Sequence, residues 1–123
     1  MTKILLIEDT ADSAELVRRI LSSRGYEVVH AADAETGLEL ALAQLPDLIL
    51  LDLGLPDYDG QTLAGWLRAE PVLDATPIVA FTAWPLETAR VMVDSYGCNG
   101  FISKPIIKAS EFIAQVDSYL KAG

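Results

Sequence analysis

The sequence predicts an α/β fold in which a parallel β-sheet is wrapped by helices on both faces. Five short apolar runs alternate with segments whose apolar residues recur at helical spacing. Most of the runs are nearly continuous in Ile, Leu and Val, which is typical of strands buried on both faces. Strict alternation with short connections predicts parallel strands joined by right-handed crossovers.

The expected strands cover residues 3–8, 27–31, 47–52, 77–82 and 100–103. Five apolar stripes at i, i+3, i+4 or i+7 predict the helices between and after them. The stripes are Ala14, Val17 and Leu21; Leu38, Ala41, Leu42 and Leu45; Leu63, Trp66 and Leu67; Ala89, Met92, Val93 and Tyr96; and Ala109, Phe112, Ile113, Val116 and Leu120. We expect Trp66, Tyr96 and Phe112 to be core or helix-packing residues. Periodicity leaves the strand order open, and a flavodoxin-like order is one of two common solutions.

Glycine and proline mark the ends of the expected helices. Gly25 and Gly97 follow helical stripes, where a left-handed cap residue is favoured. Pro85 can open the fourth helix, because its missing N–H is harmless there.

Bulk composition predicts one domain, residues 1–123, with 51% hydrophobic residues for a single core. Formal net charge is −9, from 18 acidic and 9 basic residues, so we expect no nucleic-acid binding. No apolar stretch approaches the roughly 20 residues needed to cross a bilayer, and a signal-peptide layout is missing. A single cysteine, Cys98, fits a reducing compartment, so we expect a cytoplasmic protein without membrane contact.

Three of the expected strands end in charged residues, which is the main clue to function. Glu8 and Asp9 follow the first, Asp52 the third and Lys104 the fifth. Carboxyl ends of neighbouring parallel strands lie along one edge, where such sheets bind ligands. Clustered carboxylates repel unless a cation sits among them, and Mg²⁺ prefers oxygen ligands. We expect Mg²⁺ bound by Asp9 and Asp52, by Glu8 through water and by the carbonyl of Gly54.

The remaining polar groups at this edge suit phosphoryl chemistry. The ammonium of Lys104 and the hydroxyl of Thr82 can each hold a phosphoryl oxygen. Asp52 would be the nucleophile and form an aspartyl phosphate. No separate general base is needed, because positioning and charge neutralisation dominate phosphoryl transfer.

Each of these residues taken singly has a simpler explanation. Asp52 could cap a turn, Lys104 could be a solvated surface lysine, and the acidic pair could favour a helix N-terminus. Their joint placement at strand ends is what favours a shared site. His30 ends the second strand without a partner motif, so we expect no metal or catalytic role for it.

These residues resemble the CheY-like receiver domains of two-component response regulators over essentially the whole chain. Ile7-Glu8-Asp9 is similar to the family's acidic pair, and residues 52–60 resemble the phosphoacceptor segment that ends in a Pro-x-x-Asp-Gly turn. Residues 81–83 resemble the strand-four hydroxyl motif, and residues 101–105 resemble the Lys-Pro motif.

The resemblance implies strand order 2-1-3-4-5 and a site that accepts phosphate. Asp52 would take a phosphoryl group from a sensor histidine kinase or a histidine phosphotransfer protein, with Mg²⁺ bound, and Thr82 and Lys104 would contact it. Phe101 would turn inward when Thr82 moves, altering the surface of the fourth helix, fifth strand and fifth helix. That surface would bind a downstream protein target and is the family's preferred homodimer face. The Lys104–Pro105 bond would be cis.

The same resemblance implies no enzyme in the usual sense, since the domain only assists its own Mg²⁺-dependent phosphorylation and dephosphorylation. Glu8 stands where Asp is common, Thr10 replaces a frequent Asn, and Phe101 lacks a tyrosine hydroxyl, so the switch must rest on packing. Trp84 is expected to screen the acyl phosphate from water and slow its hydrolysis.

Three alternative functions share parts of this pattern. A dehalogenase-like phosphatase normally needs a second Asp at the position of Gly54, and a flavin binder needs a hydroxyl-rich loop after the first strand. The stronger alternative is a receiver-like adaptor that acts without phosphorylation. The chain stops about one turn beyond the last helical stripe, so we expect output by protein contact from a single-domain regulator or a piece of a longer protein.

Overall fold

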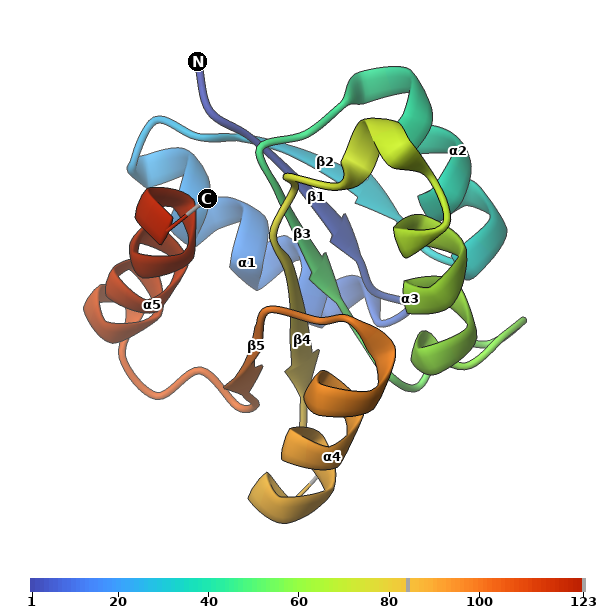
Figure 1. Cartoon of the computed structure of the whole chain (residues 1–123). Coiled ribbons are helices and arrows are strands. Elements are labelled where there is room, and N and C mark those ends of the chain that lie inside the picture. The colour runs from blue at the N-terminus through green and yellow to red at the C-terminus, as the bar shows by residue number, and fades with distance from the viewer. Residues whose placement is uncertain (84, 123) are drawn as a thin grey trace.

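A five-stranded parallel sheet forms the centre of the computed structural model, which describes residues 1–83 and 85–122. The strands are β1 (Lys3–Ile7), β2 (Glu27–Ala31), β3 (Leu48–Leu51), β4 (Ile78–Thr82) and β5 (Gly100–Ser103). The helices are α1 (Ala11–Ser23), α2 (Ala34–Gln44), α3 (Gly60–Arg68), α4 (Leu86–Tyr96) and α5 (Ala109–Ala122), with a short 3-10 helix, η1 (Pro71–Leu73). The strand order β2-β1-β3-β4-β5 confirms the flavodoxin-like α/β fold (Figure 1).

Alternating side chains of the strands build one hydrophobic core on each face of the sheet. Leu5, Ile7, Ile49 and Leu51 pack with residues of α2 and α3, whereas Ile4, Leu6, Leu48 and Leu50 pack with residues of α1 and α5. All eight are fully buried, as expected for strands covered on both sides. Figure 1 shows α1 and α5 on one side of the sheet and α2 and α3 on the other.

The second predicted stripe was wrong in detail. Small residues of α2, Ala34, Gly37 and Ala41, face the sheet, while Leu42 is 37% and Leu45 52% exposed. A Cβ at Gly37 would lie 2.8 Å from a methyl carbon of Ile7, so the helix approaches the sheet too closely for a larger side chain. Helical spacing alone is compatible with two overlapping faces of α2. Close packing against the sheet selects the face that has the smaller side chains.

Two further residues of the predicted stripes lie at the surface. Tyr96, which we expected to be a core or helix-packing residue, is 42% exposed at the end of α4, and Ala109 is exposed at the start of α5. Trp66 is half-buried and Phe112 is fully buried, as expected. Gly25 and Gly97 have φ of +87° and +80°, which confirms their left-handed positions after helices.

Arg68 joins the connections at the amino ends of β4 and β5. Its guanidinium donates to the carbonyls of Gly97 at 2.8 Å, Leu73 at 3.0 Å and Thr76 at 3.0 Å. It also donates to the side-chain oxygen of Asn99 at 2.7 Å. The sequence did not predict η1, a single turn of three residues, or this network, which joins Arg68 to residues 29 and 31 positions along the chain. Among the described residues, no helix combines the length and apolar character needed to span a membrane.

Candidate functional site

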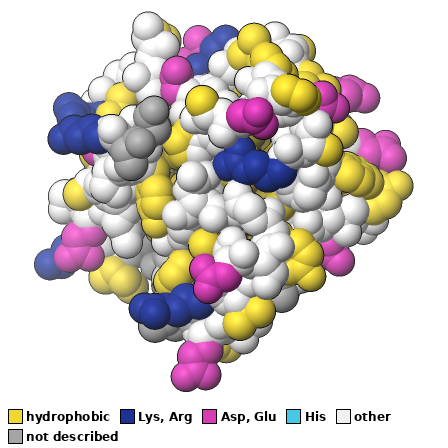
Figure 2. Space-filling model, in the orientation of Figure 1, with side chains coloured by type: hydrophobic (Ala, Val, Ile, Leu, Met, Phe, Trp, Pro, Cys, Tyr) yellow, Lys and Arg dark blue, Asp and Glu magenta, His cyan; other side chains and the backbone are white. Residues whose placement is uncertain are grey.

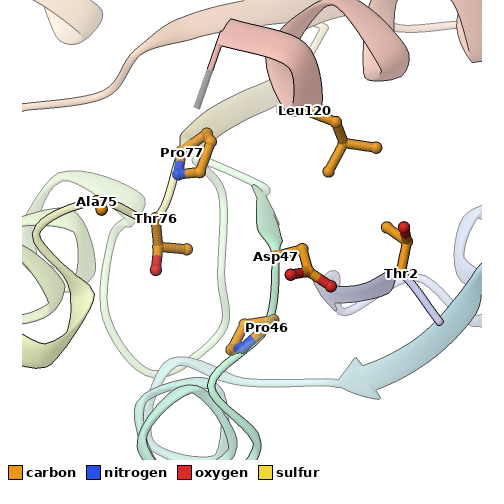
Figure 3. A pocket seen from close by; sticks show the side chains of 7 residues that line it. All are labelled: Thr2, Pro46, Asp47, Ala75, Thr76, Pro77 and Leu120. Atoms are coloured by element: carbon orange, nitrogen blue, oxygen red, sulfur yellow. The ribbon is translucent and has the colours of Figure 1, made fainter.

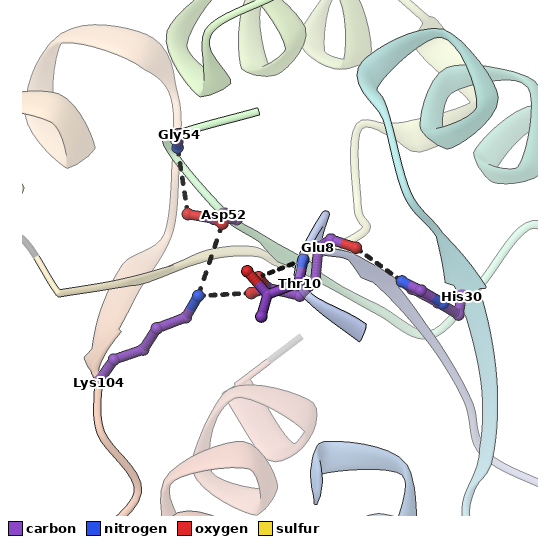
Figure 4. Close-up of polar contacts among 6 residues, drawn as sticks. All are labelled: Glu8, Thr10, His30, Asp52, Gly54 and Lys104. Atoms are coloured by element: carbon purple, nitrogen blue, oxygen red, sulfur yellow. Dashed lines mark hydrogen bonds and ion pairs between the residues drawn. The ribbon is translucent and has the colours of Figure 1, made fainter. Parts of the chain in front are cut away.

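The carboxyl ends of β1 and β3 bring three carboxylates to one edge of the sheet. One oxygen from each of Glu8, Asp9 and Asp52 lies within 4.8 Å of the others. Lys104, which follows β5, reaches the same place and contacts two of them (Figure 4). The sequence therefore predicted correctly that these four residues meet.

Glu8 is fully buried, and two donors hold its carboxylate. Its N–H donates to the carbonyl of Ala31 at 2.9 Å, which continues the pairing of β1 with β2. Its carboxylate accepts from the backbone N–H of Thr10 at 3.2 Å and from the ammonium of Lys104 at 2.5 Å. A buried carboxylate is stable only when it is paired in this way.

Asp52 stays accessible at the mouth of the site. Its N–H donates to the carbonyl of Ile7 at 2.9 Å, and its Oδ1 accepts from the N–H of Gly54 at 3.1 Å. Its Oδ2 lies 3.5 Å from the Lys104 ammonium, and 14% of its side chain is exposed. One carboxylate oxygen is thus oriented by the backbone while the side chain remains open to a donor molecule.

Lys104 is positioned by contacts with the neighbouring strand β4. Its N–H donates to the carbonyl of Thr82 at 2.8 Å, and its ammonium lies 5.0 Å from the centre of the Phe81 ring. The Lys104–Pro105 peptide bond is cis, as the resemblance implies. These contacts aim the ammonium at Glu8 and Asp52 rather than into solvent.

Thr82 and Phe101 lie on the last two strands of the sheet. Thr82 is 2% exposed at the carboxyl end of β4, next to Ser103 in register. Phe101 is half-buried in β5, and its carbonyl is 3.5 Å from the hydroxyl of Tyr119. Trp84, expected to screen the site, lies outside the described residues.

Gly60 lies directly beneath the loop that carries Asp52. Its N–H donates to the carbonyl of Leu53 at 3.1 Å. A Cβ at this position would lie 2.6 Å from the Leu53 Cα and 2.9 Å from the Asp52 carbonyl oxygen. The glycine of the Pro-x-x-Asp-Gly turn is therefore required by close approach of α3 to the site loop.

Asp59 begins α3 by accepting a hydrogen bond from the Thr62 N–H at 2.8 Å. Hydrogen bonds from the hydroxyl and the backbone of Thr62 hold the pKa of the Asp59 carboxyl below its usual value. The charged cap fixes the far end of the site loop, since an N-cap carboxylate satisfies free N–H groups of the first turn.

Sequence reasoning missed two residues that support the site. The Nε2 of His30 lies 2.7 Å from the Glu8 carbonyl, a contact between two neighbouring strand ends (Figure 4). Asp57 accepts hydrogen bonds from the N–H groups of Ala34 at 2.9 Å and Glu35 at 3.1 Å, which ties the site loop to α2. The partners are 22 or 23 residues apart, and no local pattern in the sequence marks either contact.

The donor set fits a hard divalent cation. Three carboxylates face one ammonium, which leaves an excess of negative charge at the mouth of the site. Each of the three carboxylates offers an oxygen atom, and oxygen is the ligand atom that Mg²⁺ prefers.

A separate hollow of about 340 Å³ lies at the opposite edge of the sheet, beside the amino ends of β1, β3 and β4 (Figure 3). It is lined by Thr2, Asp47, Pro77 and Leu120, among others. The Asp47 carboxylate already accepts a hydrogen bond from the Lys3 N–H at 2.7 Å. Open α/β sheets bind ligands at the carboxyl ends of strands, so we assign no function to this hollow.

The family model of the response regulator receiver domain matches residues 4–117. The chain belongs to this family. The polar-differentiation response regulator DivK of Brucella ovis is 34% identical to it over 121 residues, which is 98% of each chain.

Two solved receiver domains share its fold. The receiver domain of a Pseudomonas aeruginosa sensor histidine kinase, with a magnesium ion coordinated in its active-site cleft, has 31% identity and a TM-score of 0.88 and covers 98% of both chains. The BeF3-activated receiver domain of Klebsiella pneumoniae RstA has 26% identity and a TM-score of 0.88, and the match covers 98% of this chain and 99% of that one.

As a CheY-like receiver domain, the chain is a protein of two-component signalling. Receiver domains bind Mg²⁺ in an acidic site, and the Glu8, Asp9 and Asp52 cluster is such a group in this chain. The partners of receiver domains in two-component signalling include histidine kinases.

Proposed function

We propose that this receiver domain takes a phosphoryl group from a partner phosphohistidine onto Asp52 with Mg²⁺ bound, and signals by protein contact. The observation that carries the proposal is the position of Asp52, accessible between the Lys104 ammonium and the acidic pair. The donor would be a sensor histidine kinase or a histidine phosphotransfer protein.

In the proposed step, an oxygen of Asp52 forms a bond to phosphorus as the phosphorus–nitrogen bond of the phosphohistidine breaks. The imidazole leaves with the electrons of that bond and later takes a proton from water. Asp9 and Asp52 would hold the metal directly, with Glu8 through water and the Gly54 carbonyl as a further ligand. The metal supplies charge neutralisation for the phosphoryl oxygens.

Lys104 and Thr82 would stabilise the transferred group. The ammonium lies 3.5 Å from Asp52 Oδ2, so it can follow a phosphoryl oxygen bonded there. Thr82 ends the neighbouring strand and would approach another oxygen. The same groups assist only transfer to and from this chain, so we propose no enzymatic activity on a separate substrate.

The output surface would be α4, β5 and α5. Phe101 lies on β5 and is half-buried, so a shift of Thr82 on the adjacent strand would change its packing. This surface would bind a downstream protein target and form any homodimer.

The single described cysteine is buried and free, which supports our expectation of a cytoplasmic protein.

Metal-dependent labelling with acetyl phosphate tests the proposal. Intact mass should rise by one phosphoryl group with Mg²⁺ and stay unchanged in EDTA or in Asp52→Asn. Asp47→Asn is the matched control, because Asp47 lies at the opposite edge of the sheet and should not affect labelling. Failure of the wild-type chain to label with Mg²⁺ would favour the phosphorylation-independent adaptor instead.

A further inference from the structure

A shallow groove of about 410 Å³ lies between α2 and the end of α3, and none of its lining residues belongs to the proposed phosphorylation site or to α4, β5 or α5. Its lining combines three apolar residues, Leu38, Trp66 and Ala69, called its apolar floor here, with two acidic residues, Glu35 and Glu70. Leu38 and Trp66 are only partly buried, so apolar surface remains open to solvent between two acidic side chains.

The charge of this region is one-sided. Residues 31–67 contain seven carboxylates and no lysine or arginine. Arg68, the next residue, turns its guanidinium toward the carbonyls of Leu73, Thr76 and Gly97, so it does not neutralise the groove. Figure 2 shows hydrophobic and acidic side chains next to each other over α2. All nine basic residues of the chain lie outside residues 31–67.

Both walls of the groove are held in place by the loop after β3. Asp57 accepts hydrogen bonds from the N–H groups of Ala34 and Glu35 and so fixes the start of α2. The ring of Tyr58 packs edge-on against Trp66, with ring centres 4.7 Å apart and planes at 67°. A groove with fixed walls costs less ordering entropy when a ligand binds than one that must form first.

We propose that this groove docks a segment of a partner protein that carries an apolar anchor side chain flanked by lysine or arginine. The anchor would cover Leu38, Trp66 and Ala69, and the cationic side chains would pair with Glu35 and Glu70. Helix-in-groove recognition places apolar and charged residues in this way. The docking site is separate from the proposed output surface and does not require phosphorylation.

A synthetic amphipathic helix of leucines and lysines is the probe, and the same peptide with glutamates for lysines is its control. NMR titration of the full chain should shift amides of α2 and α3 with the lysine peptide only. Glu35→Lys with Glu70→Lys should weaken binding by about tenfold or more, which is about 1.4 kcal/mol. Glu27→Lys with Glu111→Lys changes net charge equally at exposed sites elsewhere and should leave binding nearly unchanged. Ala69→Gln, an exposed position, should also weaken it.

Several results would overturn the proposal. Equal weakening by both charge-reversed pairs would mean that only net charge attracts the peptide. Unchanged affinity of the Ala69→Gln variant would mean that the apolar floor takes no part. Shifts confined to α4, β5 and α5, or no binding by the lysine peptide, would place docking elsewhere.

Discussion

Gly60→Ala and Gly65→Ala make the same chemical change in one helix, α3, and should have opposite effects on the free energy of unfolding. A Cβ at Gly60 would fall 2.6 Å from the Leu53 Cα and 2.9 Å from the Asp52 carbonyl oxygen. Both neighbours are backbone atoms, so they cannot rotate away. At Gly65, which is exposed, no described atom outside the local helix lies within 4 Å of an added Cβ.

The two energies can be worked from these contacts. Overpacking usually costs about 1–3 kcal/mol, and the backbone clash at Gly60 places it at about 3 kcal/mol. Alanine in place of an exposed helical glycine gains about 0.5–1 kcal/mol. The variants should therefore differ by roughly 4 kcal/mol in free energy of unfolding, or about 2 M in urea midpoint for a slope near 2 kcal/mol per M.

Urea unfolding followed by circular dichroism measures the difference, and acetyl phosphate labelling measures its effect on the site. Gly60→Ala must displace the backbone of Asp52 and Leu53, so it should also label more slowly than the wild type in its folded state. Gly65→Ala should label normally. Equal urea midpoints for the two variants would refute the close-approach explanation of the glycine.

Three further predictions concern other parts of the chain. Arg68→Ala should lower the free energy of unfolding by about 2–4 kcal/mol, because three carbonyls and Asn99 lose a charged donor, while Arg19→Ala, at 77% exposure, should cost less than about 1 kcal/mol in the same urea assay. The pKa of Asp59 is lowered from 3.8, so the native state binds fewer protons there, and stability should fall as pH drops below about 4. Asp59→Asn should flatten that fall in urea midpoints measured from pH 5 to pH 3, and an unchanged slope would contradict it. Burial raises the pKa of Cys98 to about 11, so iodoacetamide should label it slowly at pH 8 until urea unfolds the chain, and rapid native labelling would contradict this.

Local pattern was sufficient for most of the architecture. Apolar runs gave each strand to within a residue or two, and a charged residue at three strand ends predicted the meeting of Glu8, Asp9, Asp52 and Lys104. These predictions work because parallel strands joined by helices all have their carboxyl ends at one edge. Strand order came from the resemblance to receiver domains, since periodicity is the same for every order.

Other features depended on contacts that span the chain. Helical spacing placed Leu42 in the core, but the close approach of Gly37 to Ile7 turns that side chain outward. His30 contacts the Glu8 carbonyl only because β2 pairs with β1 in one register.

The sequence by itself determined the alternation of strands and helices and the charged edge of the sheet, because hydrophobic periodicity and strand polarity are local properties. Tertiary structure alone decided which donors hold Glu8, why Gly60 must lack a side chain, and that Asp57 and Tyr58 fix an acidic groove between α2 and α3. Those features depend on distances between residues far apart in the chain, and such distances are set only when all the elements pack together.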